Sequence, residues 1–333
     1  MTHFSALVEI LDPRRPVLIQ AHDFPDHDAV GTAFALGRLL ETRGFSPILC
    51  YGGEIQSDSL REAIDRLEIS IFSAREMSLE FPSIKNSQII VVDGFVGNSN
   101  ISGVEGSVVG VIDHHDSPET VDLLFCDVRP GYGSCSTILY EYYNNEGIPL
   151  ARNTATALLL GIMMDTAFMT RGVSPIDLEA FSYLFFRGDW QEASRVLRNS
   201  LSMKDLSVFR EAINEVMVTE DFAFIPINKE CTPEVMALLA DFFLGIREIH
   251  FVVVLQQDRE VYRISVRSED PRSPAGAIIH KALEGIGSGG GHIHMGGGII
   301  PLDLFPGEQG TRQRFLRALG RGESLVESQS EHA

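Results

Sequence analysis

The chain is short of cysteine and has no long apolar run. Only four of its 333 residues are cysteines, and they lie far apart in no metal-binding spacing (Cys50, Cys126, Cys135 and Cys231). This argues against a disulfide framework and fits buried thiols in a reducing compartment. No apolar run approaches the roughly 20 residues that span a bilayer, and the first residues lack the pattern of a secretory leader. We therefore expect a cytoplasmic protein without a membrane partner.

Positive charge is scarce too. The chain has 27 lysines and arginines against 46 aspartates and glutamates, a formal net charge of −19. A protein that tracks long nucleic acid normally presents a basic face, because neutralised phosphates and released counterions supply most of its affinity. The charge therefore argues against a long nucleic acid partner and favours a short anionic substrate. Bound metal could offset part of it, since four ligating carboxylates would balance two divalent cations.

The chain does contain apolar runs separated by helical patterns. The N-terminal runs do not alternate with polar residues, as expected of parallel strands buried on both faces: PVLIQA (16–21), PILCY (47–51), QIIVVDG (88–94) and SVVGVIDHH (107–115). Residues 134–218 read as mostly helix. Further on, FAFIPI, IHFVVVLQQ and VYRISVRS are strand-like, and helical patterns cover 232–244 and 274–284.

A chain of this length exceeds what one hydrophobic core usually supports. The sequence predicts an α/β protein with a parallel-sheet N-terminal domain and a smaller α/β C-terminal domain, joined by a helical linker. The predicted boundaries are 1–195, 196–219 and 220–333.

Four polar residues lie where the first strand turns into a helix: His22, Asp26, His27 and Asp28. They either cap the helix or hold a cation. For one aspartate, capping would be a sufficient explanation. Two acids flanking His27, with His22 four residues before Asp26, exceed what a cap needs, and a cation site is the better interpretation.

Other polar groups follow the third and fourth runs. Asp93 ends one strand, and Asp113, His114 and His115 end the next. Ligands of open parallel sheets bind beyond the carboxyl ends of the strands, so these clusters should converge. Asp165 lies within an apolar helical pattern, where an unpaired carboxylate would cost several kcal/mol. Something positive should therefore face it.

A glycine-rich stretch, GIGSGGGHIHMGGGII (285–300), is expected to form a loop of the C-terminal domain. Its glycines would let backbone amides approach an anion beside His292, whereas a flexible linker is disfavoured by the ordered patterns on both sides. His294 could belong to the core or to the site, and His280 reads as structural. Arg267 ends a strand, where it is either solvated or clamps a phosphate.

Together these residues resemble the DHH phosphoesterase superfamily over nearly the whole chain. The family pattern H-x-x-P-D-x-D-A-x-G is present as His22, Pro25, Asp26, Asp28, Ala29 and Gly31. Later motifs correspond to Asp93, to Asp113-His114-His115 and to Asp165-Thr166. The C-terminal G-G-G-H corresponds to Gly289–His292, after Ser265-Val266-Arg267-Ser268. His27 and Thr32 depart from the family's usual glycine and serine, and His27 could alter the substrate mouth.

The resemblance implies a phosphoesterase with two Mn²⁺ ions per chain, or Mg²⁺ in their place. One ion would be held by His22, Asp26 and Asp93, and the other by Asp28, Asp93, His114 and Asp165. Asp93 would bridge the two ions and take part in catalysis. His115 would contact the phosphate or the leaving oxygen. The second domain would bind the substrate through Arg267, Ser268, Gly290, Gly291 and His292.

Within the superfamily, the chain resembles the branch of oligoribonucleases that also dephosphorylate adenosine 3',5'-bisphosphate. The expected substrate is a short oligonucleotide or nucleotide, and a homodimer is compatible with the pattern. Three alternatives stay open: a RecJ-like single-strand exonuclease, a manganese pyrophosphatase or exopolyphosphatase, and a non-catalytic nucleotide sensor. The acidic composition argues against the first, the G-G-G-H pattern against the second, and the complete ligand set against the third.

Overall fold

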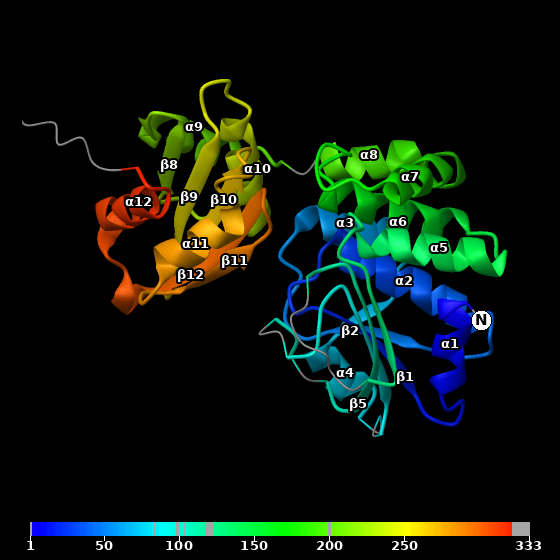
Figure 1. Cartoon of the computed structure of the whole chain (residues 1–333). Helices are drawn as coiled ribbons and strands as arrows, with labels where there is room; N and C mark the ends of the chain where they lie inside the picture. Colours follow the sequence, from blue (N-terminus) through cyan, green and yellow to red (C-terminus); the bar gives the residue numbers. More distant parts are fainter. Residues whose placement is uncertain are drawn as a thin grey trace, which may run out of the picture. The chain divides into compact units, whose positions relative to one another are not determined.

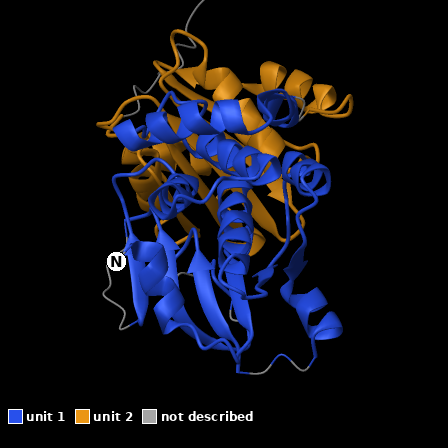
Figure 2. Ribbon diagram, turned by 90° about the vertical axis from the view of Figure 1, so that its right-hand side faces the viewer, with its two compact units in different colours: residues 1–200 blue, residues 201–333 orange. Residues whose placement is uncertain are grey.

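The computed structural model describes residues 2–82, 84, 86–97, 100–102, 104–116, 123–198 and 201–321. The chain forms two compact units, Met1–Ser200 and Leu201–Ala333, coloured separately in Figure 2. The predicted linker, 196–219, is divided between them, because helix α9 (Leu206–Glu215) packs into a core of the second unit. In the described part of the chain, no helix has both the length and the apolar character of a bilayer span.

The sheet of the first unit is parallel throughout. Its strands are β1 (Val17–Ala21), β2 (Ile48–Tyr51), β3 (Ile71–Ser73), β4 (Gln88–Val92), β5 (Ser107–Asp113) and β6 (Phe125–Val128). They lie in the order β3-β2-β1-β4-β5-β6. The chain builds outward in one direction from β1 and in the other from β4. The boundary between these two strands is therefore the topological switch point, where open α/β sheets bind ligands.

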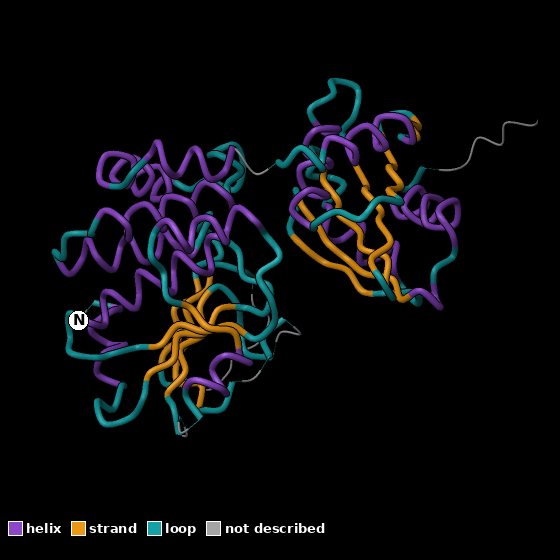
Figure 3. The backbone as a smooth tube through the Cα atoms, turned by 180° about the vertical axis from the view of Figure 1, so that it is seen from behind, coloured by secondary structure: helices purple, strands orange, loops and turns teal. Residues whose placement is uncertain are grey.

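Helices cover both faces of this sheet (Figures 1 and 3). They are α1 (His3–Ile10), α2 (His27–Glu41), α3 (Asp58–Arg66), α4 (Ala74–Glu80), α5 (Cys135–Glu146), α6 (Arg152–Asp165), α7 (Pro175–Arg187) and α8 (Trp190–Arg198). Neighbouring side chains of a strand point to opposite faces, so Ile19 joins the large core with α2, α5 and α6. Leu18 joins the smaller core, which includes Met77 of α4.

Two glycines allow α2 and α6 to approach closely. A Cβ at Gly31 would lie 2.7 Å from the carbonyl oxygen of Ala157 in α6. A Cβ at Gly161 would lie 2.6 Å from Oδ1 of Asp28 in α2. Real Cβ atoms do not come this near, so both positions require glycine. The packing brings the start of α2 beside α6, the helix that ends in Asp165.

The second unit is built on a mixed sheet. Its strands are β7 (Met217–Thr219), β8 (Phe222–Ile227), β9 (Phe251–Asp258), β10 (Val261–Ser268), β11 (Ser288–Gly291) and β12 (Met295–Pro301), in the order β11-β12-β10-β9-β8-β7. The pair β8 and β9 is parallel, and the other pairs are antiparallel. The helices are α9, α10 (Pro233–Leu244), α11 (Ala275–Leu283) and α12 (Gly307–Ala318), with a 3₁₀ turn at Leu302–Leu304. The predicted α/β class, with a helical middle and a smaller C-terminal α/β domain, is confirmed.

The glycine-rich stretch is not the loop that the sequence suggested. Most of it forms the antiparallel strands β11 and β12. Helix α11 packs onto this pair so closely that a Cβ at Gly298 would lie 2.7 Å from Cδ1 of Leu283, and one at Gly289 would lie 2.9 Å from Cγ1 of Ile279. Close helix packing therefore accounts for several of the glycines. Gly290 differs, since no described residue beyond its chain neighbours has an atom within 4 Å of a Cβ placed there.

Candidate metal centre

The polar clusters meet at the switch point of the first sheet. His22 directly follows β1, Asp93 follows β4, and His114 follows β5. These three strands are neighbours in the sheet. Asp28 comes from the first turn of α2, and Asp165 is the last residue of α6.

Four groups of described side chains bring ligand atoms close enough together to hold a cation, and Asp93 belongs to all four. Two of these groups join Asp93 to His114 and His115, and to Asp113 and Cys135. The other two contain the ligands predicted from the sequence. His22, Asp26 and Asp93 form one group, in which the ligand atoms all lie within 4.8 Å of one another. Asp28, Asp93, His114 and Asp165 form the second group under the same limit, and Asp93 belongs to both. These groups have the same members as the two ligand sets that the sequence predicted.

Asp26 and Asp28, at the start of α2, each accept hydrogen bonds from backbone amides at the N-terminus of a helix. Asp26 is the N-cap of α2, and its Oδ1 accepts hydrogen bonds from the amides of Asp28 (2.9 Å) and Ala29 (3.0 Å). Asp28 is fully buried, and its oxygens accept from the amides of Cys135 (2.6 Å) and Ser136 (2.8 Å) in the first turn of α5. The capping interpretation is therefore correct for Asp26, and the same residue still belongs to the cluster.

Asp93 is the most constrained member of the cluster. Its backbone φ is +53°, a left-handed conformation that non-glycine residues rarely adopt. The residue is 3% exposed, and among the described residues its Oδ1 has no hydrogen-bond partner. Burial and the nearby carboxylates of Asp28 and Asp26 hold the pKa of Asp93 well above its usual range. Backbone strain and an uncompensated buried carboxylate occur together at functional sites.

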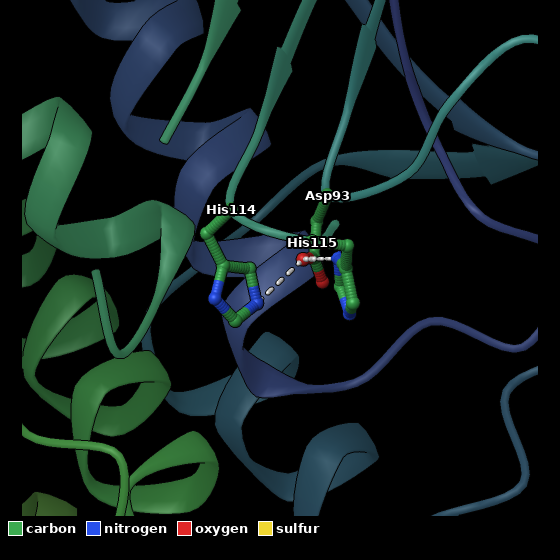
Figure 4. A group of neighbouring side chains, drawn as sticks. All are labelled: Asp93, His114 and His115. Carbon is green, nitrogen blue, oxygen red and sulfur yellow. Dashed lines mark ion pairs between the residues drawn. The ribbon is translucent and has the colours of Figure 1, made fainter. Parts of the chain in front are cut away.

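His114 is oriented by a backbone carbonyl. Its Nδ1 lies 3.2 Å from the carbonyl oxygen of Tyr132, and its Nε2 faces Asp165 at 3.1 Å. The same Nε2 lies 3.5 Å from Oδ1 of Asp93 (Figure 4). A hydrogen bond to one ring nitrogen fixes which nitrogen faces a metal, as is usual for histidine ligands. Burial alone would lower the pKa of His114, but its carboxylate neighbours, Asp165 first, raise that pKa to about 11.

His115 lies beside the same carboxylate but is more exposed. Its Nδ1 is 2.7 Å from Oδ1 of Asp113 and 3.7 Å from Oδ1 of Asp93. In Figure 4 the dashed lines from His114 and His115 meet at one oxygen of Asp93. The side chain of His115 is 36% exposed, against 8% for that of His114. His115 is therefore accessible to a ligand at the rim of the cluster.

The donor set suits hard divalent cations. Carboxylate oxygens dominate both groups, with one imidazole in each. Cys135 also lies near Asp93 and Asp113. Burial and the nearby carboxylates, Asp93 first, raise the pKa of this thiol well above its usual range, which disfavours the thiolate in the metal-free chain. Oxygen and imidazole donors without thiolate fit Mn²⁺ or Mg²⁺. The buried Oδ1 of Asp93, which accepts no hydrogen bond from the described residues, gives such an ion a place to bind.

Several supporting groups were missed by the sequence analysis. Asp113 was noted only as part of a motif, yet it orients His115. Asp23 is buried, and its carboxylate accepts from the amide (2.7 Å) and the hydroxyl (2.5 Å) of Ser102. This contact ties the segment after β1 to the segment after β4. A serine before an apolar helical pattern, as at Ser134, could have indicated the helix start that holds Asp28.

His27 is turned inward. The residue is 3% exposed, and its Nε2 lies 3.4 Å from Oγ of Ser59 in α3. The structure therefore places it within the unit, rather than at an open mouth.

The predicted substrate residues of the second unit lie at one end of its sheet. Arg267 and Ser268 end β10, Gly290 and Gly291 end β11, and His292 follows. Arg267 is paired across the sheet with Met295, whose carbonyl accepts from the amide of His292 at 2.8 Å. The guanidinium of Arg267 is mostly buried and donates from Nε to Oδ1 of Asp241 at 2.6 Å. His294 contacts the Ser268 carbonyl at 3.0 Å through Nδ1.

Comparisons with known proteins agree with this fold. Residues 16–162 match the family described as "DHH family, N-terminal domain". An exopolyphosphatase-related protein of Bacteroides fragilis superposes with a TM-score of 0.77 at 21% identity, covering 96% of both chains.

Two curated relatives match this chain over only part of their own length. The uncharacterized protein MJ1633 of Methanocaldococcus jannaschii is 28% identical over 93% of this chain and 65% of its own length. The cyclic-di-AMP phosphodiesterase GdpP of Bacillus subtilis is 26% identical over 86% of this chain and 45% of its own length. The chain therefore spans only part of these relatives.

Proposed function

We propose that this chain is a metal-dependent phosphoester hydrolase of the DHH phosphoesterase superfamily, since residues 16–162 match the model of the DHH family's N-terminal domain. The observation that carries the proposal is the position of Asp93. It lies at the switch point of the sheet, strained and buried, and it is common to all four groups of candidate ligands. Without a cation, the four carboxylates of the two predicted groups would have only two imidazoles beside them to offset their charge.

In this proposal the two ligand groups hold two Mn²⁺ ions, or Mg²⁺ in their place. His22, Asp26 and Asp93 form one site, and Asp28, Asp93, His114 and Asp165 form the other. When bound, such a pair of cations activates water and neutralises the charge that develops on a phosphoryl group. The protein's part is to hold the ligands in register, which α5 does for Asp28 and the Tyr132 carbonyl does for His114.

We assign His115 to the substrate. Asp113 holds Nδ1 of the ring, so the ring is oriented before any ligand arrives. Its other nitrogen, Nε2, would donate to a phosphoryl or leaving oxygen. Asp113 would stabilise the protonated ring, as a carboxylate behind a catalytic histidine does.

The proposed substrates are short: nanoRNA and linear dinucleotides, or adenosine 3',5'-bisphosphate. The net charge of −19 supports a short anion over a long strand. The name of the GdpP relative supports a dinucleotide, and that of the Bacteroides fragilis protein supports polyphosphate as a second candidate.

The second unit is proposed to bind the substrate through Arg267, Ser268, Gly290, Gly291 and His292. Gly290 supports this, since its Cα faces open space that a ligand could use. Arg267 would have to exchange its contact with Asp241 for a phosphate. A homodimer also stays a proposal, which light scattering of the purified chain would test.

One assay separates the candidate functions. The metal-stripped chain with added Mn²⁺ is given linear and cyclic dinucleotides, adenosine 3',5'-bisphosphate, pyrophosphate, polyphosphate and a ladder of single-stranded RNAs. We expect efficient hydrolysis of the dinucleotide or the bisphosphate. Efficiency should fall with strand length at low salt, and less steeply at moderate salt, because salt screens the repulsion of a long polyanion. Rising efficiency with length would favour the RecJ-like alternative, and no hydrolysis of any substrate would favour the nucleotide sensor.

A further inference from the structure

Two exposed phenylalanines lie in segments that also carry candidate metal ligands. Phe24 lies between His22 and Asp26 and is 50% exposed. Phe168 lies three residues after Asp165 and is 48% exposed. We propose that these two rings are stacking platforms for the nucleobases of the substrate, an inference that rests on the proposed phosphoesterase function.

The backbone on both sides of Phe24 is fixed. Asp23 and Pro25 are buried, whereas Phe24 between them is exposed. The Asp23 amide donates to the Asn100 carbonyl at 2.7 Å, and the Asp23 carboxylate binds Ser102. Pro25 restricts the next backbone angle. An apolar ring turned outward from such a rigid segment, two residues before a candidate ligand, is preorganised for contact.

Phe168 stands on a strained turn. Ala167, Phe168 and Met169 have φ of +45°, +58° and +63°, three consecutive non-glycine residues in the left-handed region. Each such residue costs about 1–2 kcal/mol and persists only when its surroundings determine it. Here the Phe168 amide donates to the Met163 carbonyl at 2.7 Å, and the Met169 amide donates to Oγ1 of Thr166 at 3.1 Å.

Two neighbouring side chains of this turn have opposite surroundings. Met169 packs against the large core of the first unit, and Phe168 points outward. The chain therefore accepts backbone strain beside Asp165 and still leaves a large apolar ring in solvent. Strain of this kind clusters at ligand sites, where it holds a group in position.

The exposure of a phenylalanine side chain would not by itself indicate a binding role. Phe186 of α7 is 84% exposed, and a single exposed apolar side chain is ordinary on a protein surface. Phe24 and Phe168 differ because each is carried by a segment that also carries a candidate metal ligand. Phe186 thus supplies a matched control from the same unit.

The chemistry of the rings indicates the substrate class. A base stacked on an aromatic side chain gains about 1–3 kcal/mol, and every base has a face that can stack. Stacking adds no charge, so it suits a strongly acidic protein. Pyrophosphate and polyphosphate have no such face. The platforms therefore favour substrates that carry bases, with little preference among the four.

The test compares base-bearing and base-free substrates. Variants Phe24→Ala, Phe168→Ala and Phe186→Ala are assayed with Mn²⁺ on linear diadenylate and on the same backbone without bases. We expect Phe24→Ala and Phe168→Ala each to raise KM for diadenylate by about 5- to 150-fold, as 1–3 kcal/mol of stacking implies. KM for the base-free substrate should not change, and Phe186→Ala should match the wild type on both. Phe168→Trp should retain the wild-type KM, and Phe168→Leu should not.

Other outcomes separate this inference from the proposed function. If the wild type hydrolyses both substrates with equal KM, or if the platform variants match Phe186→Ala, the platforms are refuted and the phosphoesterase stands. If the wild type hydrolyses neither of these substrates nor any other in the panel described above, the proposed function fails. In that case, calorimetry of diadenylate binding still tests whether the two rings stack on bases. Equal affinity in the wild type, Phe24→Ala and Phe168→Ala would refute the platforms. Unchanged Mn²⁺ binding and melting temperature show that a variant is folded.

Discussion

The sheet ends of the two units balance their charges differently. In the first unit, four aspartates and two histidines crowd together, and the pKa values of Asp28 and Asp93 are raised. In the second unit, the guanidinium of Arg267 already has Asp241 at 2.6 Å and the Val266 carbonyl at 3.1 Å. The first end needs positive charge from outside, whereas the second is neutralised within its own unit. We infer that the first unit binds cations, and that a phosphate reaching the second must compete with Asp241.

Removing the carboxylate that both ligand groups share should give the largest effect. Asp93→Asn keeps the size of the side chain but removes its charge from both sites. We expect hydrolysis to fall by at least about 10³-fold, since both cations contribute to the reaction. His292→Ala is the comparison in the other unit, and it should raise KM without loss of bound metal. Initial rates and metal content distinguish the two, and metal loss in His292→Ala would contradict the division of roles.

The excess negative charge should make the metal-free first unit less stable as the pH rises. Burial and Asp165 raise the pKa of Asp28 from 3.8 to about 7, so between these values the folded state binds more protons than the unfolded state. The stability that Asp28 contributes is fully present below 3.8, its pKa in the unfolded chain. It is lost as the pH rises through about 7, the pKa of Asp28 in the folded chain. The contribution of His114, with a pKa raised to about 11, is lost in the same direction above its unfolded value of 6.5.

We therefore expect the unfolding free energy of the stripped protein to fall by an amount on the order of 1–4 kcal/mol from pH 5 to pH 8. Mn²⁺ should reverse the trend, because ligation requires deprotonated carboxylates. Trp190 is the single tryptophan and lies in the first unit, so its fluorescence during urea unfolding reports on that unit. Asp28→Asn should flatten the slope. Stability that rises with pH in the absence of metal would refute the charge imbalance.

A pair of glycine variants separates packing from binding in the second unit. Gly298→Ala should destabilise this unit by about 1–3 kcal/mol, because the new Cβ would lie 2.7 Å from Cδ1 of Leu283. Gly290→Ala should leave stability unchanged, since nothing lies within 4 Å of the added atom. If substrate approaches this backbone, Gly290→Ala should raise KM several-fold. Calorimetric unfolding and KM measure the two effects, and an unchanged KM would leave β11 with a packing role alone.

Competition between Asp241 and a phosphate should give the smallest effect. Asp241→Asn removes the negative charge beside Arg267 but keeps an oxygen that can accept its hydrogen bond. We expect KM to fall by about 2- to 10-fold, as expected for one partly exposed charge pair. Arg267→Ala should raise KM in the same assay. A higher KM in Asp241→Asn would mean that Asp241 holds Arg267 in place for the substrate.

Much of the first unit could be predicted because its signals are local. Long apolar runs predicted β1, β4 and β5, and the polar residues that follow them were expected to converge at one edge. Strand β3 spans only three residues, too few to show a pattern, and the apolar residues of β6 are interrupted by Asp127. The left-handed backbone at Asp93 and the pairing of Arg267 with Asp241 depend on contacts between distant segments. The strands β11 and β12 were missed because glycine carries no side-chain pattern, and the fit against α11 that requires it appears only in three dimensions.

Titration of the metal-stripped chain with Mn²⁺ in a calorimeter tests the central claim most directly. The account predicts two Mn²⁺ ions per chain for the wild type. His22→Ala should lose one ion and keep the other, because His22 belongs to one ligand group, and Asp93→Asn should lose both, because Asp93 belongs to the two. Two Mn²⁺ ions bound with unchanged affinity in Asp93→Asn would contradict the shared centre.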